Sequence, residues 1–211
     1  EICIDLSSDA AEPGDLNAEG WPVAHRRAIE ASGWLTNDPV LMVMAGDRLH
    51  WRRWHRGMED LEQTLISRST LPPVDSARGG RHNDNADRLN GEQQLNSQQL
   101  AAVNAVSDHR VVLLSGGPGT GKTSTVRAML IRAMAERGDL RIHLAAPTGK
   151  AARRLQDAIR GDQRTADLTC TTLHRLLQAR PGGFGRHRRN PLAVDLLVVD
   201  EASMVDLTLA Q

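Results

Sequence analysis

The chain has 211 residues, of which 40% are hydrophobic, and its 26 basic and 26 acidic side chains give a formal net charge of zero. This length and apolar content can bury a sizeable core, which excludes a chain that is disordered throughout. Two cysteines cannot form the disulfide framework of a small secreted domain.

Other features of the sequence narrow the setting. Cys3 and Cys170 are expected to be small buried apolar residues in a reduced protein. No apolar run approaches the ~20 residues that span a bilayer, and nothing near Glu1 resembles a secretion signal. We therefore expect a cytoplasmic protein without a membrane segment, and a chain that is a piece of a longer protein.

Residues 1–70 predict a small α+β module. Residues 21–35 have helical apolar spacing, residues 40–54 hold two apolar segments around a turn at 45–48, and residues 58–66 suggest a short amphipathic helix. The four tryptophans of this module are expected in its core or on a surface that docks a partner. Residues 71–94, rich in Pro, Gly, Asn and Asp, indicate a flexible linker.

Beyond the linker, short apolar runs alternate with longer helical stretches. The runs are residues 110–115, 141–146 and 193–199, and the helical stretches between them are 123–136 and 149–159. This order predicts a parallel α/β sheet with helices on both faces in residues 95–211. The net charge is −6 for residues 1–94 and +6 for residues 95–211. The basic part suits nucleic acid, although such a charge is also common on solvated surfaces.

Residues 116–123, GGPGTGKT, fit the phosphate-binding pattern G-x-x-x-x-G-K-[ST] between an expected strand and an expected helix. Glycines let consecutive N–H groups face an anion, and the start of a helix adds a positive dipole end. Lys122 is one of only two lysines beside 24 arginines, as expected where a compact charge must enter a narrow loop. A chance glycine-rich turn is the alternative. The pattern predicts that ATP contacts Gly117, Pro118, Gly119, Thr120, Gly121, Lys122, Thr123 and Ser124.

Two acids follow the last apolar run. Because the carboxyl ends of parallel strands share one edge of a sheet, Asp200 and Glu201 are expected to face the bound phosphates. Asp200 and the Thr123 hydroxyl would then hold Mg²⁺, while Lys122 and Glu201 would act catalytically, with Glu201 deprotonating the attacking water. A helix N-cap after a strand is the structural alternative for the acids.

Four segments, GGPGTGKT, AAPTGKAARRL, TTLHRLL and LLVVDEASMVD, resemble in order and spacing motifs I, Ia, Ib and II of superfamily 1 helicases of the RecD type. RecD is the alpha subunit of exodeoxyribonuclease V, the RecBCD complex. Residues 34–56, with the segment PVLMVMAGDRLHWRRW, resemble the hairpin that precedes the ATPase core in this family. The resemblance covers nearly the whole chain and is strongest from Leu95 onward. It implies a RecA-like fold and a 5′ to 3′ DNA helicase motor in double-strand break repair and recombination, with RecB-like and RecC-like partners.

The resemblance also assigns roles to individual residues. Gln99 matches the glutamine that reads adenine in this family, and Gln98 is the alternative. The structural alternative is that the residue is a glutamine exposed on a helix and makes no contact with the nucleotide. Single-stranded DNA contacts are implied for Pro147, Thr148, Lys150, Thr172 and His174. The competing structural roles are a helix N-cap for Thr148 and for His174. The basic segment 180–189 is expected to be a solvated loop or a track for a DNA backbone, with Phe184 as a candidate for base stacking.

The chain ends ten residues after Glu201. In the family it resembles, the arginine that reaches the γ-phosphate and the second RecA-like domain follow further along. We therefore expect residues 95–211 to be a truncated first RecA-like domain that binds ATP and hydrolyses it negligibly by itself. The alternatives are a stand-alone RecD-like helicase, a nucleotide-binding interaction module without turnover, and a P-loop ATPase with no nucleic-acid role.

Overall fold

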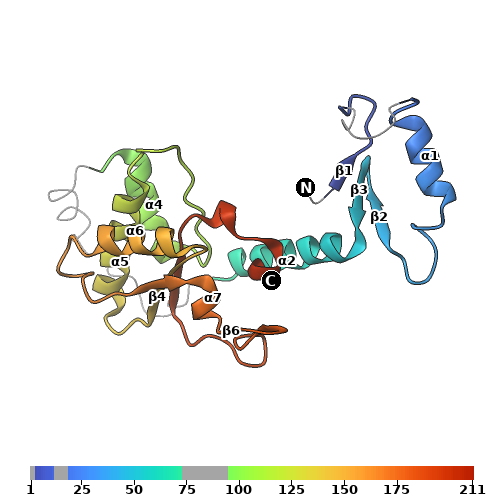
Figure 1. The fold of residues 1–211 in the computed structure, drawn as a ribbon. Coiled ribbons are helices and arrows are strands. Elements are labelled where there is room, and N and C mark those ends of the chain that lie inside the picture. The colour runs from blue at the N-terminus through green and yellow to red at the C-terminus, as the bar shows by residue number, and fades with distance from the viewer. Residues whose placement is uncertain (1–2, 12–18, 73–94) are drawn as a thin grey trace. The chain divides into compact units, whose positions relative to one another are not determined.

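The computed structural model describes residues 3–11, 19–72 and 95–211 (Figure 1). They form two compact units, one of Glu1–Thr64 with Ala210–Gln211 and one of Leu65–Leu209, called here the N-terminal unit and the α/β unit. Most of the segment interpreted as a linker, residues 73–94, lies outside the described residues. None of the helices described is both long and apolar enough to cross a bilayer.

The N-terminal unit contains a three-stranded antiparallel sheet in the order β1-β3-β2. Its core is made by Leu6, Met42 and Leu49, against which Trp21 packs. Its elements are β1 (Cys3–Asp5), α1 (Val23–Ala31), β2 (Met42–Ala45), β3 (Arg48–Trp51) and the first part of α2 (Arg52–Ser69).

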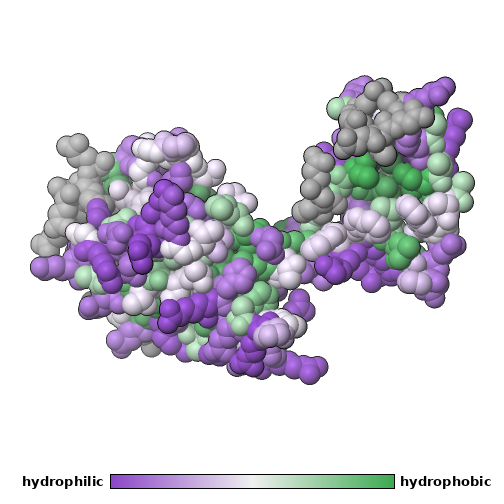
Figure 2. Space-filling model, in the orientation of Figure 1, coloured by the Kyte–Doolittle hydropathy of each residue, from purple (hydrophilic) through white to green (hydrophobic). Residues whose placement is uncertain are grey.

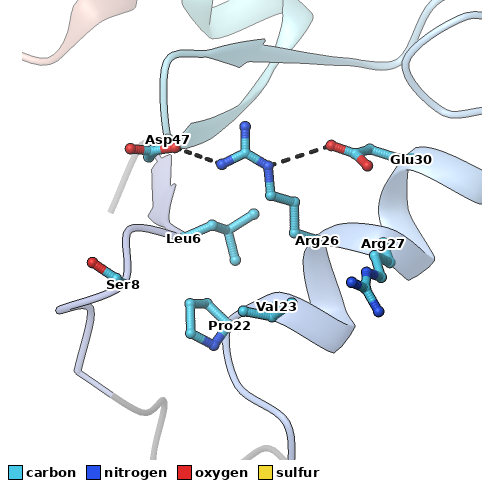
Figure 3. A pocket seen from close by; sticks show the side chains of 8 residues that line it. All are labelled: Leu6, Ser8, Pro22, Val23, Arg26, Arg27, Glu30 and Asp47. Carbon is cyan, nitrogen blue, oxygen red and sulfur yellow. Dashed lines mark hydrogen bonds and ion pairs between the residues drawn. The ribbon is translucent and has the colours of Figure 1, made fainter.

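The predicted hairpin is confirmed, because β2 and β3 pair around a turn in which Gly46 has a φ of +61°. The helix expected at 58–66 begins earlier, at Arg52, so Trp54 lies in a helix and not in a strand. Arg26 of α1 bonds both Asp47, in the hairpin turn, and Glu30, one helical turn further along (Figure 3). The contact with Asp47 joins α1 to the hairpin, and the contact with Glu30 lies within α1.

The α/β unit is built on a parallel sheet in the order β5-β4-β8. Neighbouring residues on a strand point to opposite faces. Leu144 and Val198 accordingly pack in the cluster with α5 (Lys122–Arg137) and α6 (Gly149–Ile159), while Ala145 and Val199 pack in the cluster with α7 (Leu173–Leu176) and α8 (Leu207–Ala210). The elements are α4 (Ser97–Asp108), α5 (Lys122–Arg137), β4 (Ile142–Ala146), α6 (Gly149–Ile159), β5 (Cys170–Thr172), α7 (Leu173–Leu176), β6 (Ala179–Arg180), β7 (Gly183–Phe184), β8 (Leu196–Val199), η1 (Ala202–Met204) and α8 (Leu207–Ala210). The expected fold, a parallel sheet with helices on both faces, is confirmed.

One predicted strand is wrong. Residues 110–115 form no strand, and Leu113 is 85% exposed. An apolar run becomes a strand only where a neighbour supplies backbone partners, and within the described residues β8 pairs with β4 alone. Within the described residues, the phosphate loop is therefore not preceded by a strand that pairs with β8.

Both cysteines are only partly buried, in contrast to the expectation. Cys170 stands in β5, a three-residue strand that the sequence pattern did not predict. Burial, and to a smaller extent the charge of Asp200, raises the pKa of the Cys170 thiol to about 11. This side chain is a neutral packing group near neutral pH.

Candidate nucleotide and DNA site

The phosphate loop ends where α5 begins, at Lys122. Gly119 and Gly121 have φ values of +74° and +79°, a backbone region that favours glycine. Gly121 precedes the helix and supplies no side chain to cap it, so the N–H groups of the first turn stay available for an anion. The local sequence thus builds the loop that its pattern predicts.

Lys122 folds back over this loop. Its Nζ donates to the carbonyl oxygens of Gly116 and Gly117, at 2.6 and 2.7 Å, and the Thr120 hydroxyl donates to Gly117 at 2.8 Å. Carbonyl oxygens are weaker partners for an ammonium group than phosphate oxygens, because only the phosphate carries a charge. A bound phosphate would therefore replace these contacts.

Gln99 is the glutamine that touches the phosphate loop. Its Nε2 donates to the carbonyl oxygen of Thr120 at 3.1 Å. Its Oε1 accepts from the backbone N–H of Asn96, whose own side chain accepts from the Gln99 N–H, and these two bonds form a capping box at the start of α4. The contact distinguishes Gln99 from Gln98 and gives it a structural role beside the phosphate loop.

Asp200 and Glu201 follow β8 directly. The backbone N–H of Asp200 continues the sheet by donating to Ala145, and the N–H of Glu201 donates to the Asp200 carboxylate, both at 2.9 Å. Glu201 stands before η1 but makes no capping bond, so the structural alternative of an N-cap receives no support. Its φ of +51° and ψ of +40° lie in the left-handed region, which is uncommon for a residue with a side chain.

The segment after β4 carries the first expected DNA motif. The Thr148 hydroxyl caps α6 by accepting from the N–H of Ala151 at 3.2 Å, as the structural alternative requires. Pro147 is half-buried before it, and Lys150 is exposed in the first turn of α6. A cap occupies one N–H only, so the cap and a phosphate contact at this helix end are compatible.

The segment after β5 carries the second motif. Thr172 caps α7 by accepting from the N–H of Arg175 at 3.2 Å, while His174 is exposed and makes no cap. The His174 ring lies 6.3 Å from that of Phe184. Phe184 itself packs against the core cluster of Ala145, Leu173 and Leu209, which argues against a free base-stacking ring. Within the segment 180–189, β6 and β7 form a short hairpin.

Register brings these motifs together. Ala146 of β4 pairs with Thr172 of β5, and Ala145 pairs with Val199 of β8. Pro147, Thr172 and Asp200 therefore leave the sheet at one edge, at the ends of three adjacent parallel strands. The Thr123 hydroxyl and the Asp200 carboxylate are the oxygen ligands that Mg²⁺ prefers, and one or two carboxylates with substrate phosphates suffice for it. Among the described residues no three His, Cys, Asp or Glu side chains cluster.

One residue near the acids was not predicted. Arg154, on α6, has its guanidinium 4.0 Å from a carboxylate oxygen of Glu201. The sequence feature that could have identified Arg154 is its position four residues after Lys150, because this spacing places both cations on the same face of α6.

Comparison with known proteins defines the class. Residues 99–211 match the family model described as an AAA domain, which covers more than half of the chain. The chain therefore belongs to this family.

The chain is also similar to named helicase subunits. It is 40% identical over 99% of its length to the RecBCD enzyme subunit RecD of Mycolicibacterium smegmatis, and 35% identical over 92% to that of Haemophilus influenzae. It is 37% identical over 74% of its length to the ATP-dependent RecD2 DNA helicase of Deinococcus radiodurans. The chain spans 39%, 33% and 20% of these three relatives. The resemblance to RecD-type helicases is confirmed.

Proposed function

We propose that this chain holds the ATP-binding half of a 5′ to 3′ DNA helicase motor in a cytoplasmic exodeoxyribonuclease V-type complex that acts in double-strand break repair and recombination. The observation that carries the proposal is the shared sheet edge, at which the acids and both DNA motifs end adjacent strands. The names of the relatives support the same activity.

In this proposal the residues of the phosphate loop bind and orient ATP. Lys122 moves from the carbonyl oxygens of the loop to the β- and γ-phosphates, and Gln99 faces the adenine. Mg²⁺, held by Thr123 and Asp200, would neutralise charge on the phosphates.

Glu201 accepts a proton from a water molecule whose oxygen attacks the γ-phosphorus, and the bond to the leaving ADP breaks. Single-stranded DNA follows the sheet edge, in contact with Pro147, Thr148, Lys150, Thr172 and His174. A DNA strand and a nucleotide would then bind to the same three-stranded sheet.

Substitution of Lys122 tests the motor. In the full-length protein with its partner subunits, Lys122→Ala should abolish unwinding of a duplex while the complex still assembles, because only the phosphate contact is removed. The measurements are strand displacement and size-exclusion chromatography. Unwinding at the wild-type rate would show that the phosphate loop is wrongly assigned.

A second experiment addresses the isolated chain. We expect it to bind ATP and to hydrolyse it negligibly with or without single-stranded DNA, since an arginine that contacts the γ-phosphate from outside is worth about a thousandfold or more in rate. DNA-stimulated turnover by the isolated chain would contradict this expectation.

The choice between a complex subunit and a stand-alone helicase depends on the N-terminal unit. Figure 2 shows hydrophobic surface over the strands of this unit. Its exposed large apolar side chains include Ile4, Trp34, Leu41 and Trp51. Such a surface favours docking on a RecC-like subunit, with RecB-like protein as the further partner and the carrier of the nuclease. If the full-length protein co-purifies with a RecC-like subunit and Trp51→Ala abolishes this association, the protein is a subunit of a complex. If the full-length protein does not bind a RecC-like subunit, the stand-alone helicase is favoured.

A further inference from the structure

The side chain of Glu201 has one cationic neighbour in the part of the chain that the structure describes. Arg154 approaches it to 4.0 Å, and both side chains are open to solvent, at 67% exposed for Arg154 and 36% for Glu201. Two exposed groups at this distance attract each other weakly, and either can exchange its partner for another charge. The contact is therefore a reversible one.

The backbone on both sides of this contact is held in place. Leu155 and Ile159 bury α6 against the sheet, and the pairing of β4 with β8 brings the start of α6 and the acid pair to one edge. Glu201 has a constrained left-handed backbone whose N–H is bonded to Asp200. Only the two side-chain ends are free to move.

Arg154 also lies close to an expected DNA contact. It follows Lys150 by four residues, about 6 Å along the helix axis, on the same face of α6. A guanidinium group can bind a phosphate through two parallel hydrogen bonds. The Glu201 carboxylate makes no such pair of bonds with Arg154, because its oxygen lies 4.0 Å from one guanidinium nitrogen. A DNA phosphate near the start of α6 would thus compete with Glu201 for Arg154.

We propose that Arg154 is a positioning residue that holds the Glu201 carboxylate while DNA is absent and releases it when single-stranded DNA occupies the start of α6. In the held state one carboxylate oxygen lies within ion-pair distance of the Arg154 guanidinium group, and this attraction competes with the contact between the carboxylate and a water molecule. The release makes Glu201 available as the base and links DNA binding to ATP hydrolysis. This inference rests on the proposed function, which supplies both the DNA path and the role of Glu201.

The test is the rate of ATP hydrolysis by the full-length protein, with and without oligothymidylate. An exposed ion pair shifts an equilibrium by up to about fivefold. Arg154→Ala should therefore raise the DNA-free rate about two- to fivefold while the DNA-saturated rate stays within about twofold of wild type, so that the stimulation ratio falls. Arg154→Lys, which keeps the charge, should lie between the two proteins.

Arg153→Ala is the matched control, because Arg153 is exposed on the same helix but on another face. It should leave both rates unchanged.

Three results would overturn the inference. Equal loss of both rates in Arg154→Ala and Arg154→Lys would show a general structural role, and a stimulation ratio equal to that of wild type would show no coupling. Weaker oligothymidylate binding with an unchanged DNA-free rate would show a DNA contact alone. Absence of any DNA response in the wild-type protein is a separate failure, because it would overturn the proposed function itself.

Discussion

Thr148 shows how one side chain can serve the fold and the site together. Its hydroxyl caps α6, and the same helix end is where a DNA phosphate is proposed to bind. An N-cap satisfies one of the four N–H groups that a helix leaves without partners, so the others remain for a ligand. The structural and functional interpretations of this residue are therefore not exclusive.

Substitution of Thr148 separates the two roles. Thr148→Ala should lower the free energy of unfolding by about 1 kcal/mol, because the cap is lost. Thr148→Asn should keep the stability, since asparagine caps as well as threonine does, but it should weaken binding of single-stranded DNA if the hydroxyl contacts a phosphate. Thermal unfolding and fluorescence anisotropy with labelled oligothymidylate measure the two effects. If both variants bind DNA with unchanged affinity, Thr148 caps α6 and does not contact DNA.

The thiol of Cys170 provides a second test at the scale of one residue. Because its pKa is raised to about 11, it is protonated at pH 8 and is a poor nucleophile. We expect alkylation by iodoacetamide to be slow at pH 8 and to accelerate about tenfold per pH unit up to about pH 11, as the thiolate fraction grows. Peptide mass spectrometry resolves it from Cys3. A rate that levels off near pH 9 would contradict the raised pKa.

The same shift has a consequence for stability. A group that keeps its proton in the folded state but loses it in the unfolded state favours unfolding once the pH exceeds the unfolded pKa, which is ~8.5 for cysteine. The contribution of Cys170 is therefore fully present below about pH 8 and is lost as the pH rises toward 11.

At the scale of elements, the polar contacts between α6 and the strand that follows it decide where β5 lies. Gln156 of α6 donates to the carbonyl oxygen of Leu168 at 2.7 Å and accepts from the N–H of Cys170 at 2.6 Å. The side-chain amide thus makes hydrogen bonds to the backbone just before β5 and at its first residue. These two bonds help to set the register in which Thr172 lies beside Ala146.

Removal of that amide should be costly. Gln156→Ala leaves one carbonyl and one N–H without partners, and each partly buried group of this kind costs about 1–3 kcal/mol. Gln156→Glu keeps the acceptor for Cys170 but loses the donor to Leu168, so we expect an intermediate loss of stability. Chemical denaturation measures both variants, with the exposed Asp157→Ala on the same helix as the control. Equal stability of Gln156→Ala and wild type would show that β5 is held by other contacts.

At the scale of the whole molecule, the zero net charge conceals two parts of opposite sign, −6 for residues 1–94 and +6 for residues 95–211. Lysines and arginines that touch phosphates release counterions from the DNA. For each such contact with single-stranded DNA, the logarithm of the affinity falls by about 0.7 for every tenfold rise in salt concentration. The first part, with its net charge of −6, is expected to contribute fewer such contacts than the basic part. The basic part should therefore account for the salt dependence of DNA binding.

Charge removal tests this assignment. In the full-length protein, Lys150→Ala should lower the slope of log affinity against log salt by about 0.7, because one phosphate contact is lost. Arg27→Ala, which removes an exposed cation from the N-terminal unit, should leave the slope unchanged. Titrations of labelled oligothymidylate at several salt concentrations provide the comparison. The opposite pattern would place the DNA path on the N-terminal unit.

Prediction from sequence succeeded for features that are set locally. The span expected at 149–159 is that of α6, because a capping threonine and a run of good helix formers mark it. The hairpin around Gly46 was predicted by its turn chemistry. β1 and β5 were missed because three residues carry no periodic signal, and residues 110–115 were assigned wrongly because their apolar character says nothing about the presence of a neighbouring strand.

The sequence by itself determined the phosphate loop, the parallel α/β class and the identity of the acids after β8, because each depends on residue types at fixed short spacings. Only the tertiary structure decided that Gln99 touches the loop, that the acids and the two segments proposed to contact DNA leave the sheet at one edge, and that Arg154 meets Glu201. The physical reason is that hydrogen bonding, strand pairing and ion pairing here join residues that are 21 to 54 positions apart, and local spacing carries no information about such contacts.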